Sequence, residues 1–382
     1  MSRLLESAVF ACAASLALAG AARADDLDLG AEPAPSALAW SGDLLLRQDV
    51  EHSWPGGDNE SRLLVRLRYG FNWQIDPQWI LGSALRVDES TKGNQYLVDY
   101  NDNVRPRDLA LDSLYLQYSP AEGQHLEAGK DALPLDLSRM LWDPNLRPAG
   151  LSFASRDQLS DSTALRFAAG TFLGQHLSGD QSRLYAAQVG LRFREQDLVQ
   201  PEFMLSYLHF TKLDNLLLAG EDRGNPLILG PPPCSGGGAC ITCGLPCLVP
   251  LGFQDQFELV DLQFMLHVGT PIPFRLLVDV DKNLGAVAGD DRAGRIEMAL
   301  GDSGFAGGQE VGFAAERMQQ SAVQGAFNSD EWWFHAGSHG TMFWYAYGWS
   351  DRVRLQASWF HEQPDGEWHH WNRVLLDLAW QL

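Results

Sequence analysis

Residues 62–88 read RLLVRLRYGFNWQIDPQWILGSALRVD, and side chains of two kinds alternate along them. On the first arm, the odd positions from Leu63 to Trp73 are apolar, whereas the three arginines fall on even positions. Since successive side chains of a strand point to opposite faces, the segment predicts a hairpin with one apolar face and one charged face. Aromatic residues flank its turn at 75–78, as in the aromatic girdle of a membrane barrel. We therefore predict that this hairpin is part of a transmembrane β-barrel.

The ends of the chain agree with export. Residues 1–24 predict a signal peptide, because Arg3 precedes an apolar run and a small-x-small cleavage site at 22–24. Residues 25–37 are acidic and rich in proline and alanine, which predicts a periplasmic lead-in without structure of its own. After the signal peptide, no stretch approaches the roughly 18 consecutive apolar residues that a spanning helix needs. Entry into a membrane would therefore require a closed barrel, the other structure that pairs every backbone group in lipid.

The whole chain has 382 residues and a formal net charge of −21. This acidity argues against a nucleic-acid partner, because phosphates are bound by basic surfaces. An export signal without a helical anchor fits either a periplasmic protein or an outer-membrane protein, and the amphipathic strand at the end of the chain favours the second.

Two-faced segments recur to the end of the chain. They predict an all-β fold: an antiparallel outer-membrane-type barrel of about sixteen strands over residues 38–382. Glycine-rich segments blur two strands near 283–320, so about fourteen to eighteen strands are possible within the range of bacterial barrels. One strand is predicted at 40–50, before the opening hairpin. The others are predicted at 79–89, 107–118, 124–131, 149–156, 163–172, 183–195, 201–212, 256–268, 273–282, 291–301, 309–318, 339–349, 352–362 and 372–382.

The connections between these strands alternate in length. Those at 75–78 and 119–123 are short, whereas those at 89–106 and 213–255 are long. A barrel with both termini in the periplasm has short turns on that side and long loops outside. The chain also ends flush on an amphipathic strand at 373–382, as bacterial outer-membrane barrels do. The alternative for this last segment is an edge strand of a soluble sheet.

Three segments, LDSLYLQY at 111–118, LEAGK at 126–130 and LWDPNLRPAG at 141–150, are similar to a family of bacterial outer-membrane porins. The last strand resembles that family as well, and a more distant likeness is to the alginate-export barrels. The resemblance implies passive diffusion of small hydrophilic solutes through an aqueous pore in the outer membrane of a Gram-negative bacterium. It implies no cofactor and no enzymatic activity, surroundings of lipid and lipopolysaccharide, and either a homotrimer or a monomer.

Arginine dominates the predicted inner face of the barrel. The candidates for the pore wall are Arg62, Arg66, Arg68, Arg86, Arg166, Arg192, Arg194, Arg275, Arg352, Arg354 and Arg373, with Asp88, Asp279, Asp281 and Asp377 as the acidic minority. Arginine stays charged and binds carboxylates through two hydrogen bonds, so such a wall would attract anionic solutes. We predict mild anion selectivity, or affinity for solutes that carry a carboxylate, which rests on Arg62, Arg66, Arg68 and Arg86. The alternative is that these charges pair with carboxylates and hold the wall rigid.

The loop at 132–148 is predicted to narrow the channel. In porins of similar size the third outer loop folds inward, and the resemblance implies the same here. The charged residues of this constriction are Lys130, just before the loop, and Asp136, Arg139, Asp143 and Arg147 within it. Prolines stiffen the loop by fixing the backbone angle φ. The alternative is a loop on the outer surface.

The four cysteines that follow the signal peptide all lie in the longest loop, 213–255. They are Cys234, Cys240, Cys243 and Cys247. An even number of cysteines in an exported chain predicts two local disulfides. A tetrathiolate metal site is the alternative, and the oxidising cell surface disfavours it.

Other chemistry has weaker support. His361, Glu362, His369 and His370 flank a polar loop and could bind a divalent cation, but such loops are more often only solvated. Ser358 and His361 are three residues apart in one strand and so face opposite sides, which leaves no catalytic triad. The functions that compete with a porin are a substrate-specific barrel for a polysaccharide or an organic acid, an outer-membrane hydrolase, and a soluble periplasmic β-sandwich.

Overall fold

The computed structural model describes residues 37–54, 59–91, 109–173, 182–193, 198–213, 216–217, 224–230, 249–269, 271–287, 289–328 and 335–382. The strands of this part of the chain are β1 (Leu38–Trp54), β2 (Asn59–Asp76), β3 (Trp79–Ser90), β4 (Leu109–Ala121), β5 (Gln124–Lys130), β6 (Ala149–Ser160), β7 (Thr163–Leu173), β8 (Arg183–Phe193), β9 (Val199–Thr211), β10 (Leu227–Gly230), β11 (Val249–Phe253), β12 (Glu258–Val268), β13 (Phe274–Asn283), β14 (Arg292–Asp302), β15 (Gln309–Met318), β16 (Ser338–Ser350), β17 (Val353–Pro364) and β18 (His370–Gln381). The predicted signal peptide at 1–24 and all but the last residue of the lead-in lie outside the described residues.

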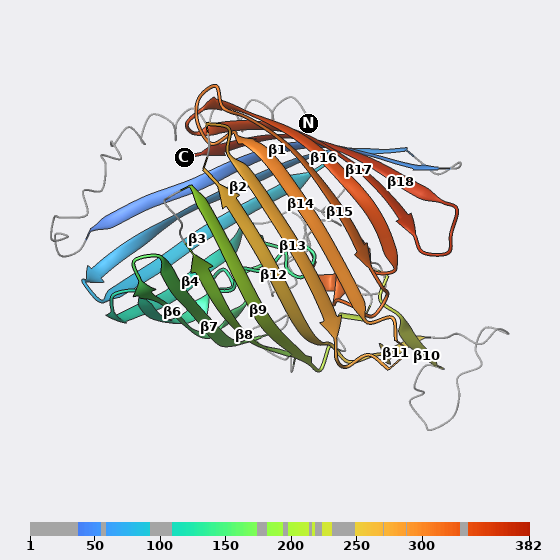
Figure 1. The fold of residues 1–382 in the computed structure, drawn as a ribbon, viewed down its shortest axis with the longest axis horizontal. Helices are drawn as coiled ribbons and strands as arrows, with labels where there is room; N and C mark the ends of the chain where they lie inside the picture. The colour runs from blue at the N-terminus through green and yellow to red at the C-terminus, as the bar shows by residue number, and fades with distance from the viewer. Residues whose placement is uncertain are drawn as a thin grey trace.

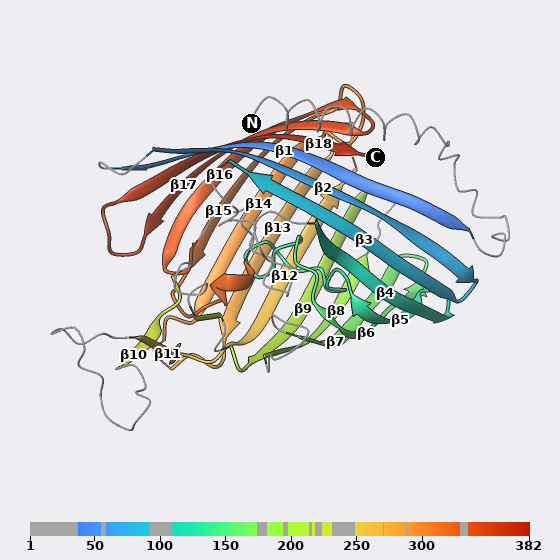
Figure 2. The same cartoon turned by 180° about the vertical axis from the view of Figure 1, so that it is seen from behind.

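Sixteen of these strands form a closed antiparallel barrel (Figures 1 and 2). The first and last strands, β1 and β18, pair with each other, and β9 pairs with β12. The predicted all-β barrel of about sixteen strands is therefore confirmed. β10 and β11 form a separate two-stranded sheet in the connection from β9 to β12. The prediction of a loop throughout 213–255 is wrong for these two strands, because each is too short to show a periodic pattern.

No helix within the described ranges is long and apolar enough to cross a membrane.

The barrel has one end with short turns and one end with long connections. The start of β1 and Leu382 both lie at the short-turn end, since the start of β1 pairs with the end of β2 and the Leu382 N–H donates to a carbonyl of β1 at 2.9 Å. The turns at 77–78 and 161–162 join strands at this end, whereas 131–148 and 319–337 join strands at the other. The alternation of lengths that the sequence predicts is confirmed.

The two faces of the barrel wall differ in the way the alternation predicts. On β2, Leu63 is 45% exposed on the outer face, while Arg62 is 5% exposed on the inner face. Near the short-turn end, the outward ring of Trp40 stacks on that of Tyr69 with centroids 5.6 Å apart. An apolar outer face with aromatic rings toward its edge suits a wall that meets lipid.

Two connections from the long-loop end fold into the barrel and fill its middle. One is 131–148, between β5 and β6, and the other is 319–328, which follows β15 and contains the 3-10 helix Gly325–Phe327. The ring of Trp142 stacks on that of Phe327 with centroids 5.2 Å apart. Figure 2 shows both segments inside the wall. The sequence predicts the inward position of the first segment, whereas the second was predicted only as a long loop.

Apolar packing and one asparagine hold these segments inside. Leu141 is only 2% exposed, whereas a loop on the outer surface would leave many of its side chains exposed. The segment therefore lies inside the barrel. In the second segment, Asn225 Nδ2 donates to the carbonyls of Gln320 and Val323 at 2.9 and 2.8 Å. Its Oδ1 accepts from the Gly325 N–H at 2.7 Å. Because these backbone groups are paired, the segment can be buried at low cost.

Strand boundaries differ from the predicted ones by at most four residues. The largest functional difference is at β17, which begins at Val353 instead of residue 352. A register shift between Gly348 and Ser350 marks a β-bulge there, and a bulge adds one residue to one strand. Arg352 therefore lies in the exposed turn between β16 and β17, and the prediction that it lines the inner face is wrong.

Replacing Trp142 or Phe327 with alanine should lower the free energy of unfolding, and the two effects should not be additive. A stacked aromatic pair contributes about 0.5–1.5 kcal/mol beyond the area it buries, so we expect a coupling energy of about 1 kcal/mol. Urea unfolding in lipid vesicles, followed by circular dichroism, would measure it. Trp142→Ala combined with Phe313→Ala, an outer-wall change, should be additive within about 0.5 kcal/mol. Equal additivity for both pairs would contradict the inward contact.

Candidate functional site

A buried ion network crosses the seam where the barrel closes. Asp49 on β1 accepts from Arg62 Nε of β2 at 2.6 Å and from Arg373 Nε of β18 at 2.9 Å. Arg47, also on β1, donates to both oxygens of Asp377 on β18 at 2.7 and 2.8 Å. Asp49, Arg62 and Arg373 are all at most 5% exposed. Two carboxylates therefore link the first strand to the last inside the barrel.

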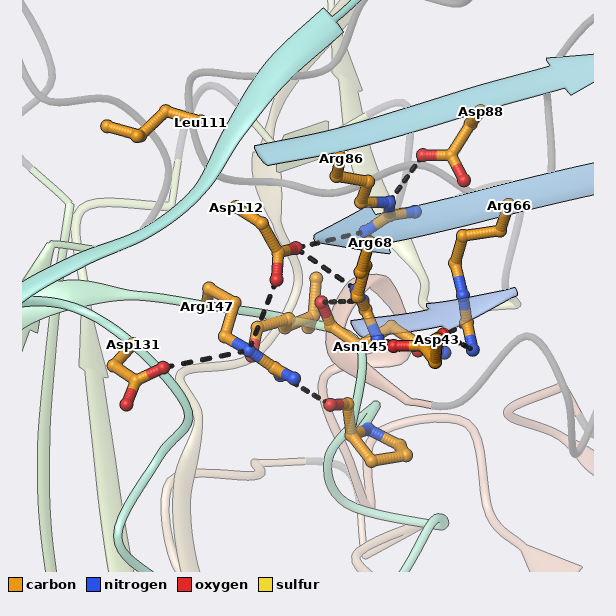
Figure 3. A network of polar contacts seen from close by, with 12 residues as sticks. Asp43, Arg66, Arg68, Arg86, Asp88, Leu111, Asp112, Asp131, Asn145 and Arg147 are labelled. Carbon is orange, nitrogen blue, oxygen red and sulfur yellow. Dashed lines mark hydrogen bonds and ion pairs between the residues drawn. The ribbon is translucent and has the colours of Figure 1, made fainter. Parts of the chain in front are cut away.

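A second network surrounds Asp112 on β4 (Figure 3). Its Oδ1 accepts from Arg68 Nε at 3.3 Å, and nitrogen atoms of Arg86 and Arg147 lie 4.0 and 3.9 Å from its carboxylate. The register between β3 and β4 shifts by one residue beside Asp112, which marks a β-bulge. The bulge leaves Asp112 buried on the inner side, out of phase with the alternation. Sequence reasoning missed this residue because a bulge has no periodic signal.

The inward segment after β5 is attached to the wall at two places. Asn145 Oδ1 accepts from Arg66 Nη1 at 2.6 Å and from Arg68 Nη1 at 3.2 Å. Elsewhere, the side-chain amide of Gln188 on β8 forms two hydrogen bonds of 2.9 Å with the backbone N–H and carbonyl of Asp136. Neither amide residue was predicted as part of the site, since a single uncharged polar side chain on an inner face is an ordinary feature of a barrel.

The residues predicted for the constriction have separate roles. Lys130 Nζ donates to a carbonyl of β4 at 2.7 Å, and Asp143 Oδ1 accepts from a backbone N–H within its own segment at 2.7 Å. Arg147 Nε lies 3.9 Å from Asp131, whose pKa is raised by partial burial while Arg147 acts in the opposite direction. Arg139 borders open space near the short-turn end. Their joint role in narrowing the channel stays a prediction.

Five of the predicted arginines form ion pairs in which the guanidinium is at most 11% exposed. They are Arg62 and Arg373 with Asp49, Arg66 with Asp43, Arg68 with Asp112, and Arg86 with Asp88. Pairing is the alternative that the sequence left open for this wall. Each of the four arginines on β2 and β3 has an aspartate beside it, so the positive and negative charges of this wall largely cancel. The wall therefore produces little net electrostatic field in the interior of the barrel.

Four of the remaining predicted arginines share two glutamates that the sequence did not single out. Arg166 and Arg192 both contact Glu202 on β9, with nitrogen–oxygen distances of 3.4 and 2.6 Å. Asp136, predicted for the constriction, also pairs with the first of these arginines. Arg194 lies outside the described residues.

Of the predicted pore-wall arginines that form ion pairs, Arg275 and Arg354 have the most exposed side chains. Both contact Glu310 on β15, at 2.6 and 3.2 Å, and their side chains are 50% and 40% exposed. The carboxylate between them is only 5% exposed. This arrangement places two guanidinium groups against one buried acid, with both groups open to the interior of the barrel.

The predicted acids of β13 are enclosed in the wall. Asp279 and Asp281 are 0% exposed, and Asp281 lies opposite the equally buried Asp261 of β12. Among the described residues, no group of three or more histidine, cysteine, aspartate or glutamate side chains is arranged to hold a metal ion. The four cysteines, Cys234, Cys240, Cys243 and Cys247, lie outside the described residues, so their pairing stays a prediction.

The histidines near the last hairpin have other partners. His361 Nδ1 lies 3.2 Å from the side-chain oxygen of Asn372, and His369 Nδ1 lies 3.0 Å from Glu367. Glu362 is fully buried and contacts His335 at 2.9 Å. Ser358 is buried on the inner side, whereas His361 is one step out of phase with it, as the spacing predicts. The predicted ligands are therefore not brought together, except that the rings of His361 and His370 lie 5.1 Å apart.

Open space inside the barrel lies toward the short-turn end, beside the inward segment after β5. One hollow has a volume of about 510 Å³. Its polar and aromatic lining includes Arg139, Arg275, Glu310, Trp344 and Arg354. A second hollow of about 400 Å³ is lined by the segment 132–146 together with β8, β9 and β12. Met265 and His267 border both, so the two hollows adjoin.

Three solved outer-membrane proteins resemble this fold. OprB of Pseudomonas putida is 10% identical with a TM-score of 0.58, and the match covers 90% of this chain and 94% of that chain. OmpT of Vibrio cholerae, with its loop L8 deleted, is 8% identical with a TM-score of 0.53, over 91% and 100% of the two chains. OmpF of Salmonella typhi, in a complex with daunomycin, is 9% identical with a TM-score of 0.53, over 90% and 97%.

No protein-family model matches the sequence, and no curated protein matches it. At the identities of the solved structures, the likeness establishes the fold. The fold is a closed sixteen-stranded antiparallel barrel that resembles those of OprB and OmpF, which confirms the fold predicted from the sequence.

Asp49→Asn should lower the free energy of unfolding by about 3 kcal/mol, because it leaves two buried guanidinium groups without their carboxylate. Asp43→Asn is the matched control on the same strand, since its side chain is 37% exposed and its pair with Arg66 is 3.5 Å long. We expect that change to cost less than about 1 kcal/mol. Urea unfolding of both variants in lipid vesicles would measure the difference. Equal midpoints would show that the seam network does not stabilise closure.

Proposed function

We propose that this chain is an outer-membrane channel through which small hydrophilic solutes diffuse down their gradients. The observation that carries the proposal is a closed barrel with an apolar outer face and a charged inner face, with open space left beside an inward-folded segment. Such a wall pairs all of its strands in lipid and keeps a polar interior. The likeness in fold to OprB, OmpT and OmpF supports this function.

The proposed location is the outer membrane of a Gram-negative bacterium, with lipid and lipopolysaccharide around the apolar face. Exposed leucine and aromatic side chains on the outside suit these surroundings. Small hydrophilic solutes are the proposed ligands, and the channel needs neither a cofactor nor a catalytic centre. The functional unit is a monomer or a homotrimer.

The proposed solute path runs beside the inward segments and not through the centre of the barrel. The stacked rings of Trp142 and Phe327 occupy the middle, and both are at most 6% exposed. The two hollows lie between the inward segment after β5 and the barrel strands β8, β9 and β12 to β17. Solutes would therefore be selected by the side chains of that wall, because charges act within about 8 Å at physiological salt.

The direct test is the conductance of the purified, refolded chain in a planar lipid bilayer. We expect stepwise increases in ion current and swelling of liposomes in small sugars. Heat-modifiable migration on a gel would show in parallel that the barrel has folded. A folded barrel that produces neither current nor swelling would contradict the proposal, as would recovery of the protein from the soluble periplasm.

Replacing Arg66 and Arg68 together with glutamine should leave the zero-current potential in a salt gradient nearly unchanged. Both arginines pair with acids and hold Asn145 of the inward segment, and neither lines one of the two hollows. Asp43→Asn, a change in the same cluster, should likewise have little effect. A shift toward cations in the double variant would contradict the proposed path and show that this wall sets the anion selectivity that the sequence predicts.

A further inference from the structure

The pair of arginines at the short-turn end is held in place by one buried carboxylate. Glu310 Oε2 accepts from Arg275 Nη2 at 2.6 Å, and its Oε1 lies 3.2 Å from Arg354 Nη2. Oε1 also accepts from Trp344 Nε1 at 2.8 Å, and Arg354 Nε donates to Ser303 Oγ at 2.7 Å. Two guanidinium groups on two different strands are therefore oriented by neighbours before any solute arrives.

These contacts use only part of the hydrogen-bonding capacity of the two arginines. A guanidinium has five N–H donors, and the bonds above engage one on Arg275 and two on Arg354. The remaining donors have no partner among the described residues, and both side chains border the 510 Å³ hollow. With one carboxylate for two guanidinium groups, the pair retains excess positive charge. Preoriented donors of this kind bind a carboxylate through paired hydrogen bonds.

Among the described residues, no ion pair joins the other carboxylates of the hollow to these two arginines. Glu297 forms an ion pair with Arg295, and Asp302 Oδ1 accepts from the Gly304 N–H at 2.8 Å near the short turn. The whole lining has three arginines, Arg139 included, and three carboxylates. The excess of positive charge is therefore local to Arg275 and Arg354, where an anionic group would bind.

The adjoining hollow has a different character. Its wall is mostly apolar side chains of the inward segment, including Leu135, Leu137 and Trp142. Its charged members are Arg192 and Glu202, which pair with each other at 2.6 Å, and Asp136, which pairs with Arg166. A hollow that held only water would need no apolar lining. The apolar side chains here therefore suit the apolar part of a solute.

We propose that the lumen contains a binding site for a small organic acid with an apolar body, such as an aryl or branched alkyl carboxylate. The carboxylate would bind Arg275 and Arg354, and the apolar body would lie against Leu135, Leu137 and Trp142. This assignment rests on the proposed channel function and specifies its solute class. Inorganic anions and acetate would use the arginines but not the apolar hollow, whereas uncharged solutes of similar shape would use only the hollow.

The experiment compares three probes: phenylacetate, acetate and 2-phenylethanol. Isothermal titration into the detergent-folded barrel measures binding without any need for conduction, and block of the ion current in a planar bilayer measures occupancy of the path. We expect phenylacetate to bind at least about tenfold more tightly than either of the other probes, because only phenylacetate makes both contacts.

The decisive variant is Arg275→Gln combined with Arg354→Gln. It should weaken phenylacetate binding by about tenfold or more, the loss expected for charged hydrogen bonds. Arg275→Gln alone, a half-exposed position, serves if the double variant does not migrate as a folded barrel. Leu137→Ser should weaken binding of phenylacetate but not of acetate. Arg292→Gln is the matched control, since this arginine is 73% exposed and does not border either hollow.

The outcomes separate the site from the channel. Equal binding of phenylacetate and acetate, or an unchanged affinity in the arginine variants, would overturn the site. Conductance without phenylacetate binding would leave the channel standing and remove the site. Binding without conductance would support the site and contradict the channel. A loss of affinity in Arg292→Gln equal to that in Arg275→Gln would show that net charge alone attracts the probe, which also overturns the proposal.

Discussion

The pairing of the first strand with the last is the constraint on which this structure depends. A sheet in lipid cannot have an open edge, since unpaired backbone groups there find no water. Asp49 and Asp377 hold arginines across this seam, on the inner side where lipid cannot reach them. Buried pairs of this kind often contribute little net stability compared with apolar packing, but the loss of one partner is costly. Their position therefore favours the closed register over any shifted one.

The inner wall is electrostatically divided. From β18 to β4, arginines and aspartates are interleaved and buried, and the inward segment after β5 is bonded to that side through Asn145. On the neighbouring wall from β17 to β13, Glu310 leaves Arg275 and Arg354 half-exposed beside the open hollow. The first wall thus supports the inward segments, while the second borders the proposed solute path. A count of arginines in the sequence cannot make this distinction, because it depends on which carboxylates lie across the strands.

Alternation along each strand was sufficient to predict the barrel and the face that most arginines occupy. Local periodicity could not reveal their partners, since Arg47 and Asp377 are 330 positions apart in the chain and meet only when the barrel closes. The bulge that turns Asp112 inward interrupts the period on which the prediction relied. Segment 319–328 was missed for another reason: its burial depends on contacts with Asn225 and Trp142, and its own sequence has no strand pattern.

A site inside a channel must bind its solute strongly enough to attract it and weakly enough to release it. In the proposed site, the shared carboxylate of Glu310 would meet both requirements, because it orients two guanidinium groups while neutralising part of their charge. A pair of arginines without that acid would hold an anion more tightly and impede its exit. The chain as a whole has a net charge of −21, yet charges beyond about 8 Å are screened at physiological salt. Attraction of anions at this wall is therefore compatible with an acidic protein, since the local balance of charge determines it.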